Sequence, residues 1–283
     1  MSGLNASLGY FFAVVAFGVL IKTLLRKWPH FGFILEFSAS FVLVACWLEV
    51  QTIVEVGQWA GGLGPDVTVT ILFVVLLTHG VVCGSASGNP TQGLLKFLLL
   101  EDTILPTSLA IAAQFLGAHL GLLVAIHYWD LELTEMHMIK NLMARECSTS
   151  LLVSLQQGFF TECVCTLIFH LLHLSLRRRS ALIRVPIVAV LLSFVSHAAS
   201  GYTSAYLNPS LAYGLTFHCP GFTFKEYAVV YWLGPLTGMI LALFLYMGHI
   251  PRIFAKNLLY SQKTRFKVPK GNTSGSQGDK KNK

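Results

Sequence analysis

The sequence predicts an all-α membrane protein made of two homologous halves, and three observations predict it. Hydrophobic residues make up 54% of the 283 positions and charged residues only 12%, and the apolar residues gather in runs long enough to cross a bilayer. One short motif, Ser-Ala-x-x-Asn-Pro-(Thr/Ser), occurs twice, at 85–91 and at 204–210. Each copy follows a lone glutamate in an apolar segment, Glu36 in the first half and Glu162 in the second.

Seven segments are candidate spans, because each holds ~20 mostly apolar residues. Two shorter segments begin at the Asn-Pro pairs and predict half-helices or re-entrant loops, since they are too short to span. The first candidate is an extra N-terminal helix, which we expect to be retained because it lacks a basic n-region and a cleavage site. It either spans the membrane or lies along it. The candidates are 6–25, 33–50, 66–86, 104–126, 151–175, 183–202 and 226–248, and the two short segments are 89–100 and 208–218.

The basic residues predict the orientation. They cluster at 22–30, at 177–184 and in the tail, and the positive-inside rule makes these segments cytosolic. The loops near 49–66 and 127–148 lean acidic and belong outside or in a lumen. Six spans after the first, with both flanks cytosolic, satisfy these assignments. The net charge of +7 therefore indicates topology and contact with anionic lipid, and not nucleic-acid binding.

The repeats and the charge pattern predict four regions along the chain. Cys147 and Cys219 both fall on the predicted non-cytosolic side, so a bridge between them is an open alternative. The tail is rich in Lys, Gly, Ser and Asn, which predicts disorder. The regions are 1–30, the extra helix and a basic loop; 31–128, the first membrane repeat; 129–250, the second membrane repeat; and 251–283, the basic cytosolic tail.

The two Asn-Pro pairs carry the functional prediction. Asn is a strong N-cap and Pro suits the first helical position, so both pairs start helices efficiently. A half-helix that starts inside the bilayer leaves free N–H groups and a positive dipole end there. Such backbone needs protein or a wet cavity around it. The two starts should therefore meet at the midplane, with the amides of Asn89 and Asn208 facing a narrow aqueous path that disfavours cations and protons. The alternative is that the pairs mark ordinary loop turns.

The titratable residues in the spans support no enzyme. A carboxylate in a span is costly, so Glu36 and Glu162 are expected to accept hydrogen bonds from the loop N–H groups and hold the loops in shape; the alternative is a proton or ion site. His170 and His173 share one helix, but without clustered carboxylates or cysteines they predict no metal site. No acid, base and nucleophile set appears, and we expect neither a cofactor nor catalysis.

At this point the chain resembles the aquaporin (major intrinsic protein) family over about 31–250. The matching residues are Leu-Glu-Phe at 35–37, Glu162 and the two boxes. The usual third residue of each box, Ala, is Thr91 in one and Ser210 in the other, and the Arg expected three positions after the second Asn is Leu211. These departures, the segment before Glu36 and the tail resemble a divergent intracellular branch. The pore signature carried over is Asn89, Pro90, Thr91, Asn208, Pro209 and Ser210.

The resemblance implies six tilted spans and two half-helices, one pore per subunit, a homotetramer, and passive flux of water and small neutral solutes such as glycerol. It implies an intracellular membrane, endoplasmic reticulum or vesicle, with the plasma membrane as alternative. Without the Arg, the constriction should be wide and apolar. The departures leave a poorly conducting scaffold or interaction protein as the alternative function. The constriction maps to Val69, Ser196, Ala205 and Leu211, with His197 as an alternative to Ser196.

Overall fold

The computed structural model describes residues 2–57, 59, 63, 67–144 and 147–248. The chain divides into two compact units, Met1–Leu243 and Phe244–Lys283. The second unit is described only over 244–248, where the last helix ends. The predicted disordered tail over 251–283 lies outside the described residues, as does Asp66 of the acidic loop.

The described residues form helices, and six of these are long and apolar enough to cross a membrane. The all-α, multi-pass fold predicted from the apolar runs is confirmed. The last span is one helix over Phe224–Tyr246. It consists of α10 (Phe224–Tyr227), the π-helical turn η3 (Ala228–Leu233) and α11 (Gly234–Tyr246). The others are α1 (Gly3–Leu25), α2 (Gly32–Glu55), α5 (Ile104–Asp130), α7 (Leu155–Leu176) and α8 (Ala181–Ala198).

The segment predicted as a span over 66–86 is shorter than expected. It forms α3 (Thr68–Cys83), of 16 residues, which is ~24 Å long at the rise of an α-helix and falls short of the ~20 residues of a usual span. The helix ends at Gly84, whose φ of +67° turns the backbone into the first motif. Its length is therefore limited by the loop that must follow it.

Two half-helices follow the two motifs, as the Asn-Pro pairs predict. They are α4 (Pro90–Leu98) and α9 (Pro209–Leu215), and each is capped by its own Asn side chain. The residue before each Asn takes a left-handed conformation, with φ +60° at Gly88 and +55° at Leu207. A non-glycine residue pays ~1–2 kcal/mol for this conformation. The packing of the second loop must therefore hold Leu207 in place.

The two halves use the same close helix crossing. In the first half α5 crosses α2 at Gly117 and Gly121, and in the second α11 crosses α7 at Gly234 and Gly238. A Cβ on Gly117 would lie 2.2 Å from the carbonyl oxygen of Phe37, and one on Gly238 would lie 2.3 Å from that of Cys163. Small residues let membrane helices approach closely. The repeat therefore extends from the motifs to the helix packing.

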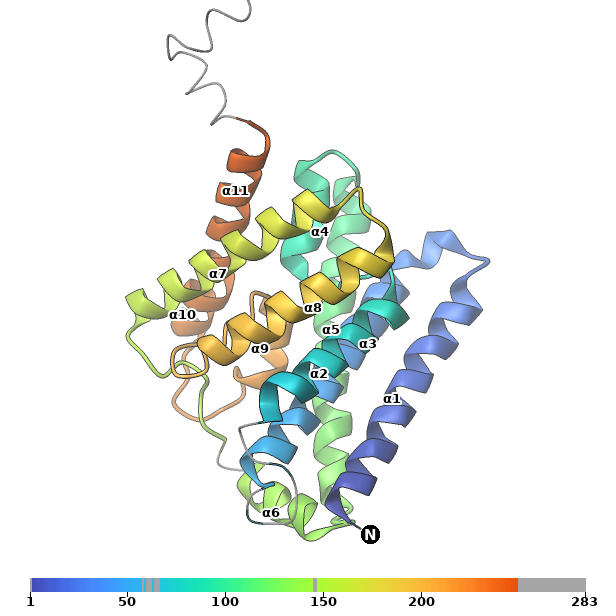
Figure 1. Ribbon diagram of the computed structural model, residues 1–283, viewed down its shortest axis with the longest axis vertical. Coiled ribbons are helices and arrows are strands. Elements are labelled where there is room, and N and C mark those ends of the chain that lie inside the picture. The colour runs from blue at the N-terminus through green and yellow to red at the C-terminus, as the bar shows by residue number, and fades with distance from the viewer. Residues whose placement is uncertain (1, 58, 60–62, 64–66, 145–146, 249–283) are drawn as a thin grey trace, which may run out of the picture. The chain divides into compact units, whose positions relative to one another are not determined.

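The extra N-terminal helix α1 runs antiparallel to α2 and also borders α3 (Figure 1). Ser7 near its start contacts Glu49 late in α2, whereas Gly18 near its end meets Val42 and Val82. The contacts continue along most of its length. Packing of this kind favours the spanning alternative over a helix that lies on the membrane surface.

One prediction about the acidic loop is wrong. Glu49 does not lie in an outer loop, because α2 continues to Glu55. Glu49 is fully buried and takes hydrogen bonds from Ser7, from the ring nitrogen of His137 at 2.9 Å and from the indole of Trp129 at 3.1 Å. Three donors can satisfy a buried carboxylate, and His137 comes from α6 (Glu135–Ala144), an unpredicted helix inside the second acidic loop.

Candidate pore

Each Asn side chain of the motifs donates a hydrogen bond to the loop of the opposite half. Nδ2 of Asn89 donates to the carbonyl oxygen of Leu207 at 3.1 Å, and Nδ2 of Asn208 donates to that of Gly88 at 2.9 Å. Both asparagines are buried and both line one cavity. A primary amide has two N–H groups, so each asparagine retains one donor beyond the one given to the opposite loop.

The unusual third residues of the boxes fix the amides. The hydroxyl of Thr91 donates to Oδ1 of Asn89 at 2.8 Å, and the hydroxyl of Ser210 lies 2.9 Å from both Oδ1 of Asn208 and the carbonyl oxygen of Gly88. The N–H groups of Thr91 and Ser210 donate to the same Oδ1 atoms. Oδ1 is thereby occupied, which forces the NH₂ side of each amide toward the cavity. His170 contacts the Thr91 hydroxyl through Nε2 at 3.2 Å and is fully buried.

Glu36 joins the first loop to two helices. Its Oε2 accepts the N–H groups of Ser87 at 3.1 Å and Gly88 at 2.9 Å, and the amide of Gln114 on α5 at 2.8 Å. Lys96 on α4 lies 3.9 Å away from Oε1. Glu36 thus has a basic neighbour on the half-helix that its own loop precedes.

Glu162 makes the matching contacts in the second half. It accepts the N–H of Tyr206 at 3.0 Å and of Leu207 at 2.9 Å. These are the same motif positions that Glu36 binds in the first loop. The carboxylate is fully buried, so the two backbone donors and its other partners replace the water it has lost.

Two cavities lie on opposite sides of this centre. The first, of about 320 Å³, opens toward the ends of α7 and α4 and reaches both box asparagines. We call it the basic-end cavity, because its mouth holds Lys96, His173, Arg177 and Arg184, with Arg177 paired to Glu101. The second, of about 340 Å³, is the disulfide-end cavity, because Cys147 and Cys219 form a disulfide in its wall. The alternative that these cysteines pair is thus realised in the structure.

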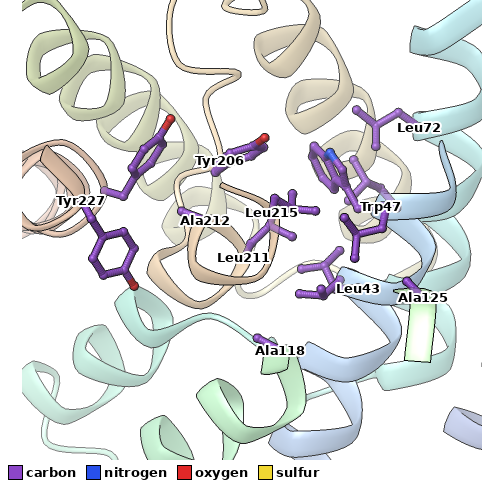
Figure 2. Packing of buried hydrophobic residues seen from close by; sticks show 14 of the residues in the cluster. Leu43, Trp47, Leu72, Ala118, Ala125, Tyr206, Leu211, Ala212, Leu215 and Tyr227 are labelled. Atoms are coloured by element: carbon purple, nitrogen blue, oxygen red, sulfur yellow. The ribbon is translucent and has the colours of Figure 1, made fainter. Parts of the chain in front are cut away.

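The four positions mapped to the constriction differ in whether they line a cavity. Ala205 and Leu211 line the basic-end cavity, whereas Val69 and Ser196, like His197, line neither cavity. The space beside Leu211 is taken by Trp47 of α2 and by Tyr206 (Figure 2), in the same buried cluster. The surroundings of Leu211 are therefore apolar, and aromatic rings pack there.

Several residues that shape the site carry little signal in the sequence. Gln114 and Trp47 sit in apolar spans with no repeat to mark them, and Tyr206 occupies a variable position of the motif. A polar residue in a span was the available signal for Gln114. The contact of His170 with Thr91 has no signal in the sequence, and among the described residues no group of three His, Cys, Asp or Glu side chains could hold a metal.

The disulfide-end cavity also contains a perturbed histidine. Partial burial lowers the pKa of His218 below its ordinary value, and the neighbouring His119 lowers it further. His218 is thus neutral at pH 7. With its walls supplied by Gln51, Ser150 and His218, this cavity offers hydrogen-bond donors and acceptors to a neutral solute.

Paired half-helices that meet inside a bundle of apolar spans, with a cavity on either side, define a polytopic membrane channel. A profile described as "Major intrinsic protein" matches residues 24–246. The chain belongs to this family, the aquaporins, whose members are channels and not enzymes.

Individual relatives agree with this assignment. Aquaporin-12 of Mus musculus is 43% identical over 285 residues, which cover 99% of this chain and 98% of that protein. Putative aquaporin-12A of Homo sapiens is 39% identical over 99% of this chain and 92% of its own length. Aquaporin-11 of Rattus norvegicus is 28% identical, with 87% and 90% covered.

A solved structure supports the fold. The X-ray structure of the aquaglyceroporin from Plasmodium falciparum superposes with a TM-score of 0.56 at 20% identity, and the match covers 78% of this chain and 96% of that one. At this identity the similarity concerns the fold alone.

Proposed function

We propose that this protein conducts water and small neutral solutes, of glycerol size or below, passively across an intracellular membrane. The observation that carries the proposal is the reciprocal asparagine pair. Asn89 and Asn208 each keep a free amide donor at the floor of the basic-end cavity. The N-terminal ends of α4 and α9 converge there, and their dipoles oppose the entry of cations and protons.

The test is osmotic flux through the full chain reconstituted in vesicles. Asn208→Asp keeps the size of the side chain but removes the donor and adds a negative charge. Flux of water and glycerol should fall toward that of protein-free vesicles. Asn5→Asp, an exposed position on α1, is the matched control and should conduct like the wild type. If Asn208→Asp conducts normally, the paired amides do not form the path.

A second candidate function is a poorly conducting scaffold of an organelle membrane. It is favoured by one observation: Trp47, Tyr206 and Leu211 are almost fully buried between the two cavities. A wild type that passes neither water nor glycerol, and that no change at this layer opens, would favour the scaffold over the channel.

The proposed setting is a homotetramer surrounded by lipid, in the endoplasmic reticulum or in vesicles. Large apolar side chains are exposed on several spans, including Phe12 at 67%, Leu182 at 88% and Phe194 at 63%. Such surfaces face lipid or a neighbouring subunit. Light scattering of the purified protein in detergent measures the subunit number, and surface biotinylation of intact cells distinguishes an internal membrane from the plasma membrane.

A further inference from the structure

The two cavities are separated by one layer of side chains. The basic-end cavity reaches Trp47 and Leu211, and the disulfide-end cavity begins one residue further along α2, at Leu48, and one turn further along α9, at Leu215. Trp47, Tyr206 and Leu211 are exposed by only 6%, 3% and 2%. A solute that moves from one cavity to the other must therefore pass this layer.

Tyr206 is the fixed side of the layer. Its N–H is bound by Glu162 at 3.0 Å, its hydroxyl lies 2.7 Å from that of Ser150 and 3.5 Å from the amide nitrogen of Gln51, and its ring packs on Tyr231 with centroids 5.6 Å apart. The backbone, the ring and the hydroxyl are thus each held by a different element.

The two halves of the repeat contribute side chains of different size to this layer. The motif position filled by Tyr206 in the second loop is filled by Ser87 in the first. Ser87 lines the open basic-end cavity. The first half therefore leaves its side of the path open, whereas the second half fills its side with a ring.

Trp47 is the side of the layer that can move. Its ring meets Tyr206 edge to face, with centroids 5.9 Å apart and planes at 78° (Figure 2). It projects from α2 and borders the basic-end cavity. Because the indole borders that cavity, a change of its rotamer would take it away from Tyr206 into the cavity, and side chains change rotamer far faster than helices move.

We infer that Trp47, resting against the fixed ring of Tyr206, is the gate and the size-selective element of the path, with Leu211 as its floor. The inference rests on the proposed channel function. The layer excludes solutes by size and apolarity: it admits a small neutral molecule when the indole turns, and it is closed when the rings are in contact.

The test compares glycerol and water flux for a graded series in full-chain vesicles. Trp47→Ala should raise glycerol flux several-fold relative to water, and Trp47→Phe should raise it less. Tyr206→Phe, which frees the ring from Ser150 and Gln51, should also raise it. Trp28→Ala and Tyr202→Phe are matched controls, because both side chains are exposed and neither lines a cavity. They should leave flux unchanged.

Each outcome decides between the proposals. If the wild type conducts and neither change at Trp47 alters the glycerol-to-water ratio, the gate is wrong and the channel stands. The gate is equally wrong if Val69→Ala has as large an effect as Trp47→Ala. If the wild type is silent and Trp47→Ala conducts, the layer at Trp47 is shown to close the path, but the proposal that the wild type itself conducts is wrong. If neither the wild type nor any variant conducts, the proposed channel and the proposed gate are both wrong.

Retention of an encapsulated dye separates conduction from leak. Vesicles that lose the dye are counted as damaged, so extra glycerol flux in dye-retaining vesicles belongs to the path. Should Trp47→Ala fail to fold, Trp47→Phe and Leu211→Ala carry the same comparison.

Discussion

At the scale of single residues, the centre of the molecule depends on a few buried hydrogen bonds. Glu36 and Glu162 each bind two successive N–H groups of a motif loop. Each loop then offers a carbonyl oxygen to the asparagine of the other half. The glutamates therefore position the loops, and the loops position the asparagines.

Replacing Glu162 should cost stability before it changes selectivity. Glu162→Ala leaves the N–H groups of Tyr206 and Leu207 without their acceptor, at ~1–3 kcal/mol for each buried donor. Glu162→Gln keeps one acceptor oxygen and should cost less. Thermal unfolding in detergent measures the order wild type, Gln, Ala. Glu135→Ala, at an exposed position, is the control. A Glu162→Ala protein of normal stability that conducts ions would instead support a proton or ion site.

At the scale of elements, two kinds of contact hold the helices together. Glycine pairs bring α5 onto α2 and α11 onto α7, and dispersion contacts at short range drive association in lipid. A buried polar cluster around Glu49 links α1, α2, α5 and α6. The first kind of contact is shared by both halves, whereas the second joins the extra helix to residues of both halves.

The glycine crossings predict a sharp effect from a single added methyl group. A Cβ at Gly117 meets backbone at 2.2 Å, so Gly117→Ala must push α5 away from α2, at ~1–3 kcal/mol or more for an overpacked contact. Gly9→Ala is the matched control, because nothing lies within 4 Å of its Cβ. Unfolding temperatures of the two proteins check this. If both behave alike, the close crossing is not a source of stability.

The Glu49 cluster predicts which contacts hold α1 against the rest of the helix bundle. Both side chains of the hydrogen-bonded Glu49–His137 pair are fully buried, and removing one partner of a buried hydrogen bond costs ~1–3 kcal/mol or more. His137→Ala should therefore destabilise the protein strongly. Glu55→Ala breaks the more exposed Lys140–Glu55 pair and should cost only ~0–1 kcal/mol. Protease sensitivity of the α1–α2 connection, read with the unfolding temperature, tells whether α1 has detached.

At the scale of the whole molecule, charge and redox chemistry agree on an orientation. Lys22, Lys96, Arg177 and Arg184 lie at the end where the first cavity opens, and the Cys147–Cys219 disulfide lies at the other. Basic ends face the cytosol, whereas disulfides persist in oxidising compartments. Both arguments predict that the disulfide-end cavity faces a lumen or the outside of the cell.

This orientation predicts the labelling pattern in sealed microsomes. With the four unpaired cysteines replaced by alanine, Ser180→Cys, next to the basic loop, should react with a membrane-impermeant maleimide at once. Cys147 and Cys219 should react only after permeabilisation and reduction. Reaction of the disulfide cysteines in sealed, reduced vesicles would reverse the orientation.

The sequence by itself determined the class, the repeat and the centre of the molecule. Long apolar runs need a bilayer, and a motif that occurs twice indicates two equivalent positions in the fold. The Asn-Pro pairs could therefore be found from their repetition, and their glutamates from the free-energy cost of a carboxylate within a span. The extra helix was visible for the same reason.

The tertiary structure decided what fills the space around that centre. Whether Glu49 lies in a loop or in the interior depends on Ser7 and His137, which arrive from distant elements. Whether Leu211 opens a wide pore depends on Trp47 and Tyr206, which lie 159 residues apart along the chain (206 − 47) and yet share one layer. A motif fixes the backbone around itself, but the width of a path is set by side chains that fold against it from elsewhere, and their approach is a property of packing.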